Sequence, residues 1–329
     1  GGAFAALRGG GDDSACGGRK LTVAATPEIA EPLEEALAKV EESDACADFD
    51  VTSASAADTA RNINEGQAPD VWIPDSSTWV DAVDASKTTG QWLEGQSIAS
   101  SPVVLASGDD QKAKVTKFSS WGSLLNNEGG LRMANPDTDT SSRLAFHASR
   151  IGQPERIGLQ TGERLIFMSR FAAPSLNKLF ADYTSDQKGT QPFPASEQQI
   201  ATYNEDNPDV TPLRAVVPEK GTLSLDYPWI MNPELSGELL QHADSARTEL
   251  GTLDMREALT EAGFRDPNGA SGPEVAGSAA ALRRLRSRAI SGTRHRGTPR
   301  RARSSRGPRV RSASETTAAV SARCGEHVT

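Results

Sequence analysis

The first quarter of the sequence is built from one unit that repeats in kind: a short β-prone run, a tight polar turn and an amphipathic helix. Leu21–Ala25 is an apolar run typical of a buried strand. Thr26 suits a helix N-cap, Pro27 the first helical position, and Glu28 the positive end of the helix dipole. Apolar residues then recur at helical spacing up to Glu42, at Ile29, Leu33, Leu37 and Val40. The pattern predicts a strand, a turn and a helix in direct succession.

The same unit recurs twice before residue 86. Strands are expected at 49–52 and 70–74, polar turns at 53–55 and 75–77, and helices at 56–65 and 78–85. Strands that alternate with helices through short connections form mainly parallel sheets with both faces covered. The predicted fold class is therefore α/β.

A second set of elements follows an apolar, β-branched run at 98–107, which we expect to pass between two lobes. Helices are expected at 121–125, 143–150, within 162–184, at 195–204, 234–250 and 254–262; strands at 131–134, 213–217 and 223–231; and a polar turn at 135–142. The last strand returns the chain to the first lobe. The predicted lobes are 20–100 with 223–268, and 101–222.

Charge divides the chain into two different polymers. Residues 281–329 hold 13 Arg, no Lys and two Glu, a net charge of +11. Residues 1–280 hold 22 basic and 42 acidic groups, a net charge of −20. We interpret 269–329 as a disordered Arg-rich tail, with out-of-frame translation and a polyanion-binding segment as alternatives. Function is therefore sought in the acidic body, for which nucleic acid is not an expected partner.

The termini and the apolar runs exclude some protein classes. Residues 1–19 are Gly-rich and predict a flexible leader. No apolar run approaches the ~18 residues that suggest a membrane-spanning helix. The chain has three Cys and four His, too few and too scattered for a structural zinc framework, so no metal is expected.

Polar turns follow the carboxyl ends of the predicted strands, and each turn opens a helix. Ligands of open α/β sheets bind outside these strand ends, where helix N-termini present free N–H groups and a positive partial charge. Hydroxyl side chains add donors without adding charge. Ligand contacts are therefore expected at Thr26, Ser53, Ser55, Asp75, Ser76, Ser77, Thr138, Thr140, Ser141 and Ser142. The alternative is that each of these residues is an ordinary helix cap.

Catalytic signals are weak, and the cysteines indicate a structural role. The sequence has no G-x-S-x-G, no phosphate-binding loop, no G-x-G-x-x-G and no H-E-x-x-H. We therefore expect neither catalysis nor a cofactor. Cys16 precedes the first strand and Cys46 the second, so neighbouring strands would bring both to one sheet edge. A disulfide between them is predicted, which implies an oxidising compartment; the alternative is two unrelated thiols.

Several segments carry a resemblance to a known family. Leu21–Glu28, Ala68–Trp79 and Ser101–Ala106 resemble bacterial extracellular solute-binding proteins with the type 2 periplasmic-binding fold, and molybdate-binding proteins are the most similar in pattern. Leu131–Ser142, Ser196–Gln199, Leu225–Trp229 and Ala262–Pro267 resemble an actinobacterial version, in which a von Willebrand factor A domain often follows. Here the D-x-S-x-S metal motif of such a domain is absent and the Arg-rich tail stands in its place.

The resemblance implies two α/β lobes, a hinge near 98–106 and 218–226, and a ligand in the cleft between the lobes. Oxyanion-binding members use hydroxyls and helix N-termini, which correspond to the predicted turns, and Tyr227 on the returning strand is a further expected contact. The sequence departs from the hydroxyl-rich oxyanion pattern at Glu28, Asp75, Asp137 and Asp139, all of which are acidic.

We therefore expect an extracellular or cell-surface, membrane-tethered solute-binding protein. It would capture a small polar ligand or an oxyanion, for transport or surface sensing, with a membrane transporter or a surface protein as partner. A monomer is expected. The alternative is a surface adhesion module that keeps the fold without binding a small ligand.

Overall fold

The computed structural model of the chain describes residues 19–44, 46–126, 131–150, 168 and 170–268. Its first sheet has the strand order β2-β1-β3-β9-β4. The strands are β1 (Leu21–Ala25), β2 (Phe49–Ser53), β3 (Val71–Ile73), β4 (Gln96–Ser97) and β9 (Pro228–Met231). β1 is parallel to both β2 and β3, whereas β9 is antiparallel to β3 and β4. The strand–turn–helix units thus form the parallel half of this sheet, as predicted.

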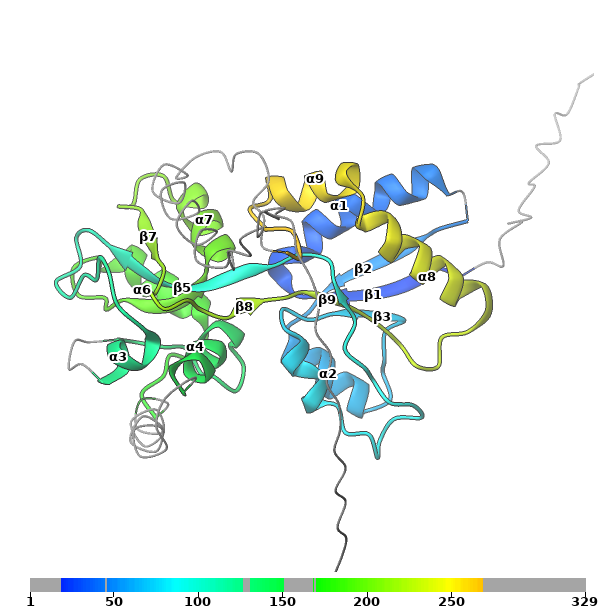
Figure 1. Ribbon diagram of the computed structural model, residues 1–329, viewed down its shortest axis with the longest axis horizontal. Helices are drawn as coiled ribbons and strands as arrows, with labels where there is room; N and C mark the ends of the chain where they lie inside the picture. The colour runs from blue at the N-terminus through cyan, green and yellow to red at the C-terminus, as the bar shows by residue number, and fades with distance from the viewer. Residues whose placement is uncertain (1–18, 45, 127–130, 151–167, 169, 269–329) are drawn as a thin grey trace, which may run out of the picture. The chain divides into compact units, whose positions relative to one another are not determined.

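Helices cover both faces of the first sheet (Figure 1). α1 (Pro27–Ser43), α8 (Gly237–Leu250) and α9 (Leu253–Glu261) share one apolar core with Val23 and Ala25 of β1. α2 (Ala56–Asn64) and the 3₁₀ helix η1 (Ser77–Ala82) share a separate core that includes Ala24 and Trp72. The two cores follow from the alternation of side chains along each strand.

The first helix forms as its sequence predicts. Pro27 occupies the first turn, where a missing N–H costs nothing. Ile29 and Leu33 are fully buried against the sheet, and Leu37 and Val40 are each 1% exposed, so the apolar stripe of α1 faces the core. Pro32 lies inside the helix and has no N–H to donate to the carbonyl of Glu28.

The second sheet is centred on β5 (Ser101–Gly108) and differs from the predicted mainly parallel arrangement. β6 (Phe193–Ser196) and β7 (Leu213–Val216) flank β5, and β8 (Ser224–Leu225) pairs with its first residues. All three are antiparallel to β5. The chain passes from β4 of the first sheet into β5, and it returns from β8 into β9 of the first sheet. The outgoing strand β5 and the returning strand β8 therefore run in opposite directions. The α/β class itself is confirmed.

Within the described residues, four helices accompany the second sheet: α3 (Trp121–Asn126), α4 (Thr140–Arg150), α6 (Leu176–Ser185) and α7 (Glu197–Asp206). α4 begins three residues before the predicted start, so it includes hydroxyl residues that we had placed in the preceding turn. α6 falls within the predicted helical region, of which 162–167 lies outside the described residues. The tail 269–329 and leader residues 1–18 also lie outside them.

Three predicted elements differ from the structure. The predicted strand 131–134 is a single bridge from Ala134 to Ala173, because the Ala134 N–H donates to the Ser142 hydroxyl instead of to a strand. The predicted helix 78–85 is the shorter 3₁₀ helix η1, whose first N–H, of Ser77, donates to Asp226 Oδ1 at 2.8 Å. The predicted strand 223–231 divides into β8 and β9 at Tyr227, which has a positive φ of 36°.

The division at Tyr227 moves the chain from one sheet to the other. β8 pairs with β5 of the second sheet, and β9 pairs with β3 of the first. A positive φ turns the backbone sharply but is unfavourable for a bulky residue. The Tyr227 ring, which is fully buried, packs edge-on against Phe264 with ring centroids 5.0 Å apart. The lobe boundaries at 100/101 and 222/223 stay predictions.

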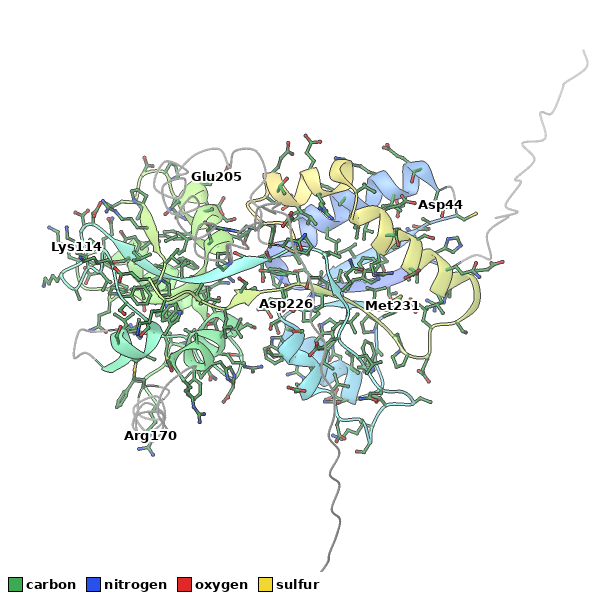
Figure 2. The ribbon with its side chains drawn as sticks, viewed as in Figure 1. Asp44, Lys114, Arg170, Glu205, Asp226 and Met231 are labelled. Atoms are coloured by element: carbon green, nitrogen blue, oxygen red, sulfur yellow. The ribbon has the colours of Figure 1, made fainter. Side chains whose placement is uncertain are left out.

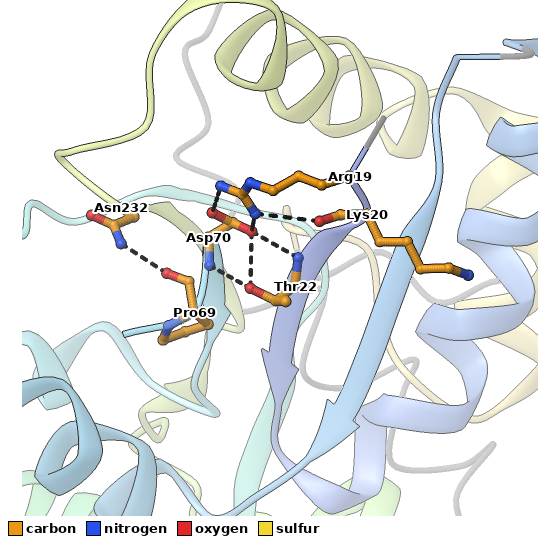
Figure 3. Close-up of polar contacts among 6 residues, drawn as sticks. All are labelled: Arg19, Lys20, Thr22, Pro69, Asp70 and Asn232. Carbon is orange, nitrogen blue, oxygen red and sulfur yellow. Dashed lines mark hydrogen bonds and ion pairs between the residues drawn. The ribbon is translucent and has the colours of Figure 1, made fainter. Parts of the chain in front are cut away.

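The amino end of the first sheet is held by a carboxylate. Asp70, just before β3, accepts two hydrogen bonds from the Arg19 guanidinium at 2.6 and 2.8 Å. It also accepts the backbone N–H of Thr22 at 2.9 Å (Figure 3). Cys46 lies between α1 and β2, whereas Cys16 lies outside the described residues, so the disulfide between them stays a prediction.

Candidate ligand-binding site

A cavity of about 700 Å³ is lined by residues from both sheets and their helices. The first sheet contributes the start of α1, the start of α2, and Asp75 and Trp79 after β3. The second contributes 138–140 before α4, 175–177 and Phe180 of α6, and much of α7. A volume of this size is typical of a pocket for a small organic molecule.

The parallel strands explain why the cavity forms where it does. Thr26 follows β1, and its N–H donates to the carbonyl of Ile73, the last residue of β3, at 3.2 Å. The carboxyl ends of β1 and β3 therefore meet at one edge of the sheet, and the residues that follow each strand come together there. Ligands of α/β sheets bind at this edge.

Of the eleven predicted contact residues, five line the cavity and six do not. The lining includes Thr26, Ser55, Asp75, Thr138 and Thr140. Ser53, Ser76, Ser77, Ser141 and Tyr227 are not part of it. Ser142, also named among the turn hydroxyls, is fully buried and bonded to the Ala134 N–H.

The residues outside the lining have other partners. Ser76 caps η1, accepting from the Thr78 N–H at 3.3 Å. The Ser141 hydroxyl donates to Gln199 Oε1 at 3.3 Å, and the Tyr227 hydroxyl to Glu28 Oε1 at 3.1 Å. These contacts fit the alternative reading of the turn residues as caps and packing groups.

The lining also contains residues that were not among the predicted contacts. They include Glu28 and Glu31 of α1, Asp139, Trp79, and the α6 and α7 aromatics Phe180 and Tyr203. Glu28 and Asp139 had a signal in the sequence, because each lies within two residues of a predicted contact. Phe180 and Tyr203 had none, because their proximity depends on how α6 and α7 pack, with the two rings stacked at 4.7 Å.

Asp75 joins the two sides of the cavity. Its Oδ1 accepts hydrogen bonds from Trp79 Nε1 at 2.9 Å and from the Thr140 hydroxyl, at the start of α4, at 2.7 Å. Trp79 Nε1 also lies 2.8 Å from Thr140 Oγ1. Burial, followed by the nearby charge of Glu28, raises the pKa of the Asp75 carboxyl to about 8.

Two more carboxyls share this environment. Burial raises the pKa of Glu28 even though the Tyr227 hydroxyl donates to it. Burial likewise raises the pKa of Asp139, against the effect of its bonds to Ser142, whose N–H donates to Asp139 Oδ2 at 2.8 Å. Burial thus disfavours the ionised forms of all three carboxyls, and for Glu28 and Asp75 the charge of acidic neighbours adds to this effect.

Arg143 of α4 lies close enough to this group for its charge to favour the ionised form of Asp139. Its guanidinium lies 3.9 Å from the centroid of the Trp79 ring. Its Nε and Nη2 donate to the carbonyls of Pro136 and Asp137 at 2.9 and 3.0 Å. Arg143 therefore stacks behind Trp79 and is not part of the cavity lining.

Thr26 stands at the cavity wall next to Glu28. Its side chain caps no backbone N–H of α1, although Thr26 is the N-cap residue. The residue is 3% exposed, and its hydroxyl oxygen is closed off from solvent. The interaction of this side chain with the Glu28 carboxyl opposes the rise in the pKa of that group.

The described residues show neither a metal centre nor a membrane-spanning helix. Within them, no group of three or more His, Cys, Asp or Glu side chains is placed to hold a metal ion. None of the described helices combines the length and hydrophobicity of a membrane span.

Residues 21–162 match the family of bacterial extracellular solute-binding proteins. None of the curated proteins compared with the chain matches it. The ferric binding protein of Campylobacter jejuni has a similar structure, with a TM-score of 0.60, 11% identity, and coverage of 83% of this chain and 98% of that one. The sulfate-binding protein SubI of Mycobacterium tuberculosis is also similar, with a TM-score of 0.57, 16% identity, and coverage of 80% of this chain and 91% of that one.

A third similar structure is an extracellular solute-binding protein of Bordetella parapertussis, with a TM-score of 0.55, 14% identity, and coverage of 83% of this chain and 97% of that one. At these identities the likeness concerns the fold. The two-lobed α/β periplasmic-binding fold that the sequence predicts is confirmed, as is the resemblance that led to it.

Proposed function

Residues 21–162 carry the domain of the bacterial extracellular solute-binding proteins, and from that premise we propose that this protein captures one small polar solute in the cavity between its two sheets. The observation that carries the proposal is the cavity itself, because residues of both sheets line it. A pocket between two lobes is the usual position of a ligand that stabilises the closed form.

The binding mechanism follows from the residues that face each other. Thr26 and Asp75 belong to the first sheet, whereas Thr138 and Thr140 precede or begin α4 beside the second. A solute that contacts both groups binds the closed arrangement better than an open one, so it shifts the equilibrium between them. The Asp75–Thr140 hydrogen bond already crosses this gap, and a bound solute adds to it.

The fold leaves the identity of the solute open. Two of the three similar proteins named above bind sulfate and ferric iron according to their names. These two ions carry opposite charges. The chemistry of the ligand must therefore come from the lining residues of this chain. Handing the solute to a membrane transporter, or reporting it through a surface protein, is the role we propose for the bound form.

We place the protein outside the cytoplasm, tethered to the membrane, as a non-catalytic monomer with Cys16 joined to Cys46. The family supports an extracytoplasmic setting. An adhesion module that keeps the fold without binding a solute is the competing function, and solute binding itself separates the two.

The proposal is tested by thermal unfolding of the full chain with oxyanions, sugars, amino acids, amines and metal ions. A solute present at 100 times its dissociation constant stabilises the folded state by about 2.7 kcal/mol. We expect one class to raise the unfolding temperature. No shift with any class would leave the adhesion module as the better function.

A pair of variants on α6 places binding in the cavity. Asn177 is exposed and lines the cavity, whereas Ala181, one turn later on the same helix, is exposed and does not. Asn177→Trp fills part of the cavity and should weaken solute binding at least about tenfold, the loss that follows from ~1.4 kcal/mol. Ala181→Trp should leave it unchanged. Equal binding by both variants would place the solute elsewhere.

A further inference from the structure

We propose that the solute is an organic cation, an amine or a guanidinium compound, whose positive group is held by Glu28, Asp75 and Asp139. This inference rests on the proposed function, since it names the ligand class of the same cavity. It differs from the oxyanion that the family resemblance implies. Three observations carry it: the acidic lining of the cavity, the free acceptors, and the aromatic wall.

The described lining is acidic, and the nearby Arg143, whose charge favours the ionised form of Asp139, is not part of it. Among the described residues that line the cavity, the charged ones are Glu28, Glu31, Asp75, Asp139, Glu205 and Asp206, and none is Lys, Arg or His. Glu205, near the end of α7, is labelled in Figure 2. An anion placed here meets carboxylates with no described cation in the wall. The same carboxylates attract a cation.

The carboxylates keep acceptor capacity for a ligand. Both hydrogen bonds to Asp75 from described residues use Oδ1, and Oδ2 accepts none from them. Asp139 accepts the Ser142 N–H at Oδ2. Among the described residues, the hydrogen bonds of Arg143 go to two backbone carbonyls and not to these carboxyls. Ammonium and guanidinium groups donate several hydrogen bonds and suit such oxygens.

Size and the aromatic wall favour an organic cation over a metal ion. The cavity of about 700 Å³ exceeds the space that a bare ion fills, and the described acidic groups do not form a metal-binding set. Phe180 and Tyr203 line the wall as a stacked pair with centroids 4.7 Å apart. Aromatic rings in the wall of an acidic cavity can bind ammonium groups through cation–π contacts.

The test compares cationic probes with neutral partners of similar shape. Binding of putrescine is compared with that of 1,4-butanediol, and binding of L-arginine with that of L-citrulline, by calorimetry and thermal unfolding of the full chain. Sulfate, molybdate and Fe³⁺ form three further arms. We expect at least one cationic probe to bind at least about tenfold more tightly than its neutral partner, and the anions to have no effect.

The outcomes separate this inference from the function beneath it. Tight binding of sulfate, of molybdate, of Fe³⁺, or of the neutral partners as well as the cations would overturn the organic-cation ligand while the solute-binding function stands. Failure of every probe and of the wider solute screen would overturn both.

Two matched pairs of variants identify the groups that hold the cation. Glu28→Gln removes a cavity carboxylate, whereas Glu35→Gln removes an exposed one further along α1. Asp139→Asn removes the cavity charge but keeps a residue able to cap α4, and Asp137→Asn is its exposed neighbour. We expect Glu28→Gln and Asp139→Asn to weaken the cationic probe at least about tenfold, and the controls less than about twofold.

These variants also guard against a loss of folding. Each is checked for an unchanged unfolding temperature without ligand, so that weaker binding reflects the site. If the cavity variants bind the cationic probe as well as their controls do, the carboxylates do not hold it and the inference fails.

Discussion

The two ends of β3 place two aspartates in opposite circumstances. Asp70 precedes the strand and Asp75 follows it, five residues later. Asp70 is 7% exposed and accepts hydrogen bonds from the Arg19 guanidinium and from both the N–H and the hydroxyl of Thr22 (Figure 3). Burial raises the pKa of Asp70, but the bonds from Arg19 and Thr22 outweigh it, so the pKa is lowered overall.

Asp75 receives only uncharged donors from the described residues, Trp79 and Thr140. Burial and the charge of Glu28 raise its pKa to about 8. The aspartate before β3 is therefore stabilised in its ionised form, whereas the aspartate after β3 is stabilised in its neutral form. The end with the matched charge ties β1 to β3, whereas the end with unmatched charges forms the cavity wall.

The comparison distinguishes carboxylates that stabilise the fold through an ion pair from those that we propose bind a ligand. A carboxylate with a guanidinium partner is satisfied and gains little from a solute. Carboxyls with raised pKa values gathered in a cleft are a common sign of a functional site. Three substitutions test this division, beginning with the carboxylate whose loss should cost most.

The largest loss of stability is expected on replacing Glu197, a deeply buried carboxylate that pairs with Arg265. Arg265 Nε donates to Glu197 Oε2 at 2.7 Å, and their side chains are 6% and 2% exposed. Glu197→Ala leaves the guanidinium buried and no longer neutralised by this carboxylate. Removing one partner of a buried pair costs about 3–5 kcal/mol. Urea unfolding of the full chain measures the loss.

The control for Glu197 is an exposed ion pair on the same sheet. Asp109 pairs with Arg214, and their side chains are 44% and 46% exposed. Asp109→Ala should cost less than about 1 kcal/mol, since solvent screens the pair. A similar cost for Asp109→Ala and Glu197→Ala would mean that burial of the pair does not set its contribution.

The next effect is expected at Asp70. Asp70→Ala removes the acceptor for Arg19 and Thr22 and should cost about 1–3 kcal/mol at neutral pH, measured by urea unfolding. Because the pKa of Asp70 is lowered in the folded state, this contribution is present above the unfolded pKa. It is lost as pH falls through the folded pKa.

Two comparisons check the role of Asp70. Asp48→Ala removes an exposed pair with Lys20, whose side chains are 52% and 60% exposed, and should have a much smaller effect. Solute binding by folded Asp70→Ala should match the unchanged protein, because Asp70 lies at the end of β3 away from the cavity. Weaker binding at Asp70 would contradict the division between the two ends.

The order of strands and helices was predictable where sequence patterns are local. The run Leu21–Ala25, the turn at Thr26 and the helix after Pro27 are specified by neighbouring residues, and the structure has each of them. The direction of β5 was not predictable, because it depends on which sheet the chain enters. The break at Tyr227 was also hidden, since no glycine marks its positive φ.

The candidate site was predictable in position and less so in chemistry. Strand ends located Thr26, Ser55 and Asp75, because the carboxyl ends of parallel strands share an edge. Reading each hydroxyl as a donor favoured an anion. The grouping of Glu28 and Asp139 with Asp75 favours the cation that we propose instead, and this grouping depends on how the two sheets and their helices come together around the cavity, which no local sequence pattern specifies.

The effect expected at Asp75 differs in kind, because it grows with pH and has the opposite sign from that of Asp70. The folded protein keeps the Asp75 proton up to a pKa of about 8, whereas the unfolded chain loses it near the ordinary value of 3.8. Between these values the folded state binds more protons, so stability falls as pH rises. Asp75→Asn retains an oxygen for Trp79 and Thr140 without a charge to bury. It should therefore gain stability relative to the unchanged protein as pH is raised from 5 to about 8, measured by urea unfolding at each pH.

Asp81→Asn, an exposed change on η1, should leave the pH dependence as it was. A relative gain for Asp70→Asn over the same range, or none for Asp75→Asn, would show that the two ends of β3 do not differ in the way their partners indicate.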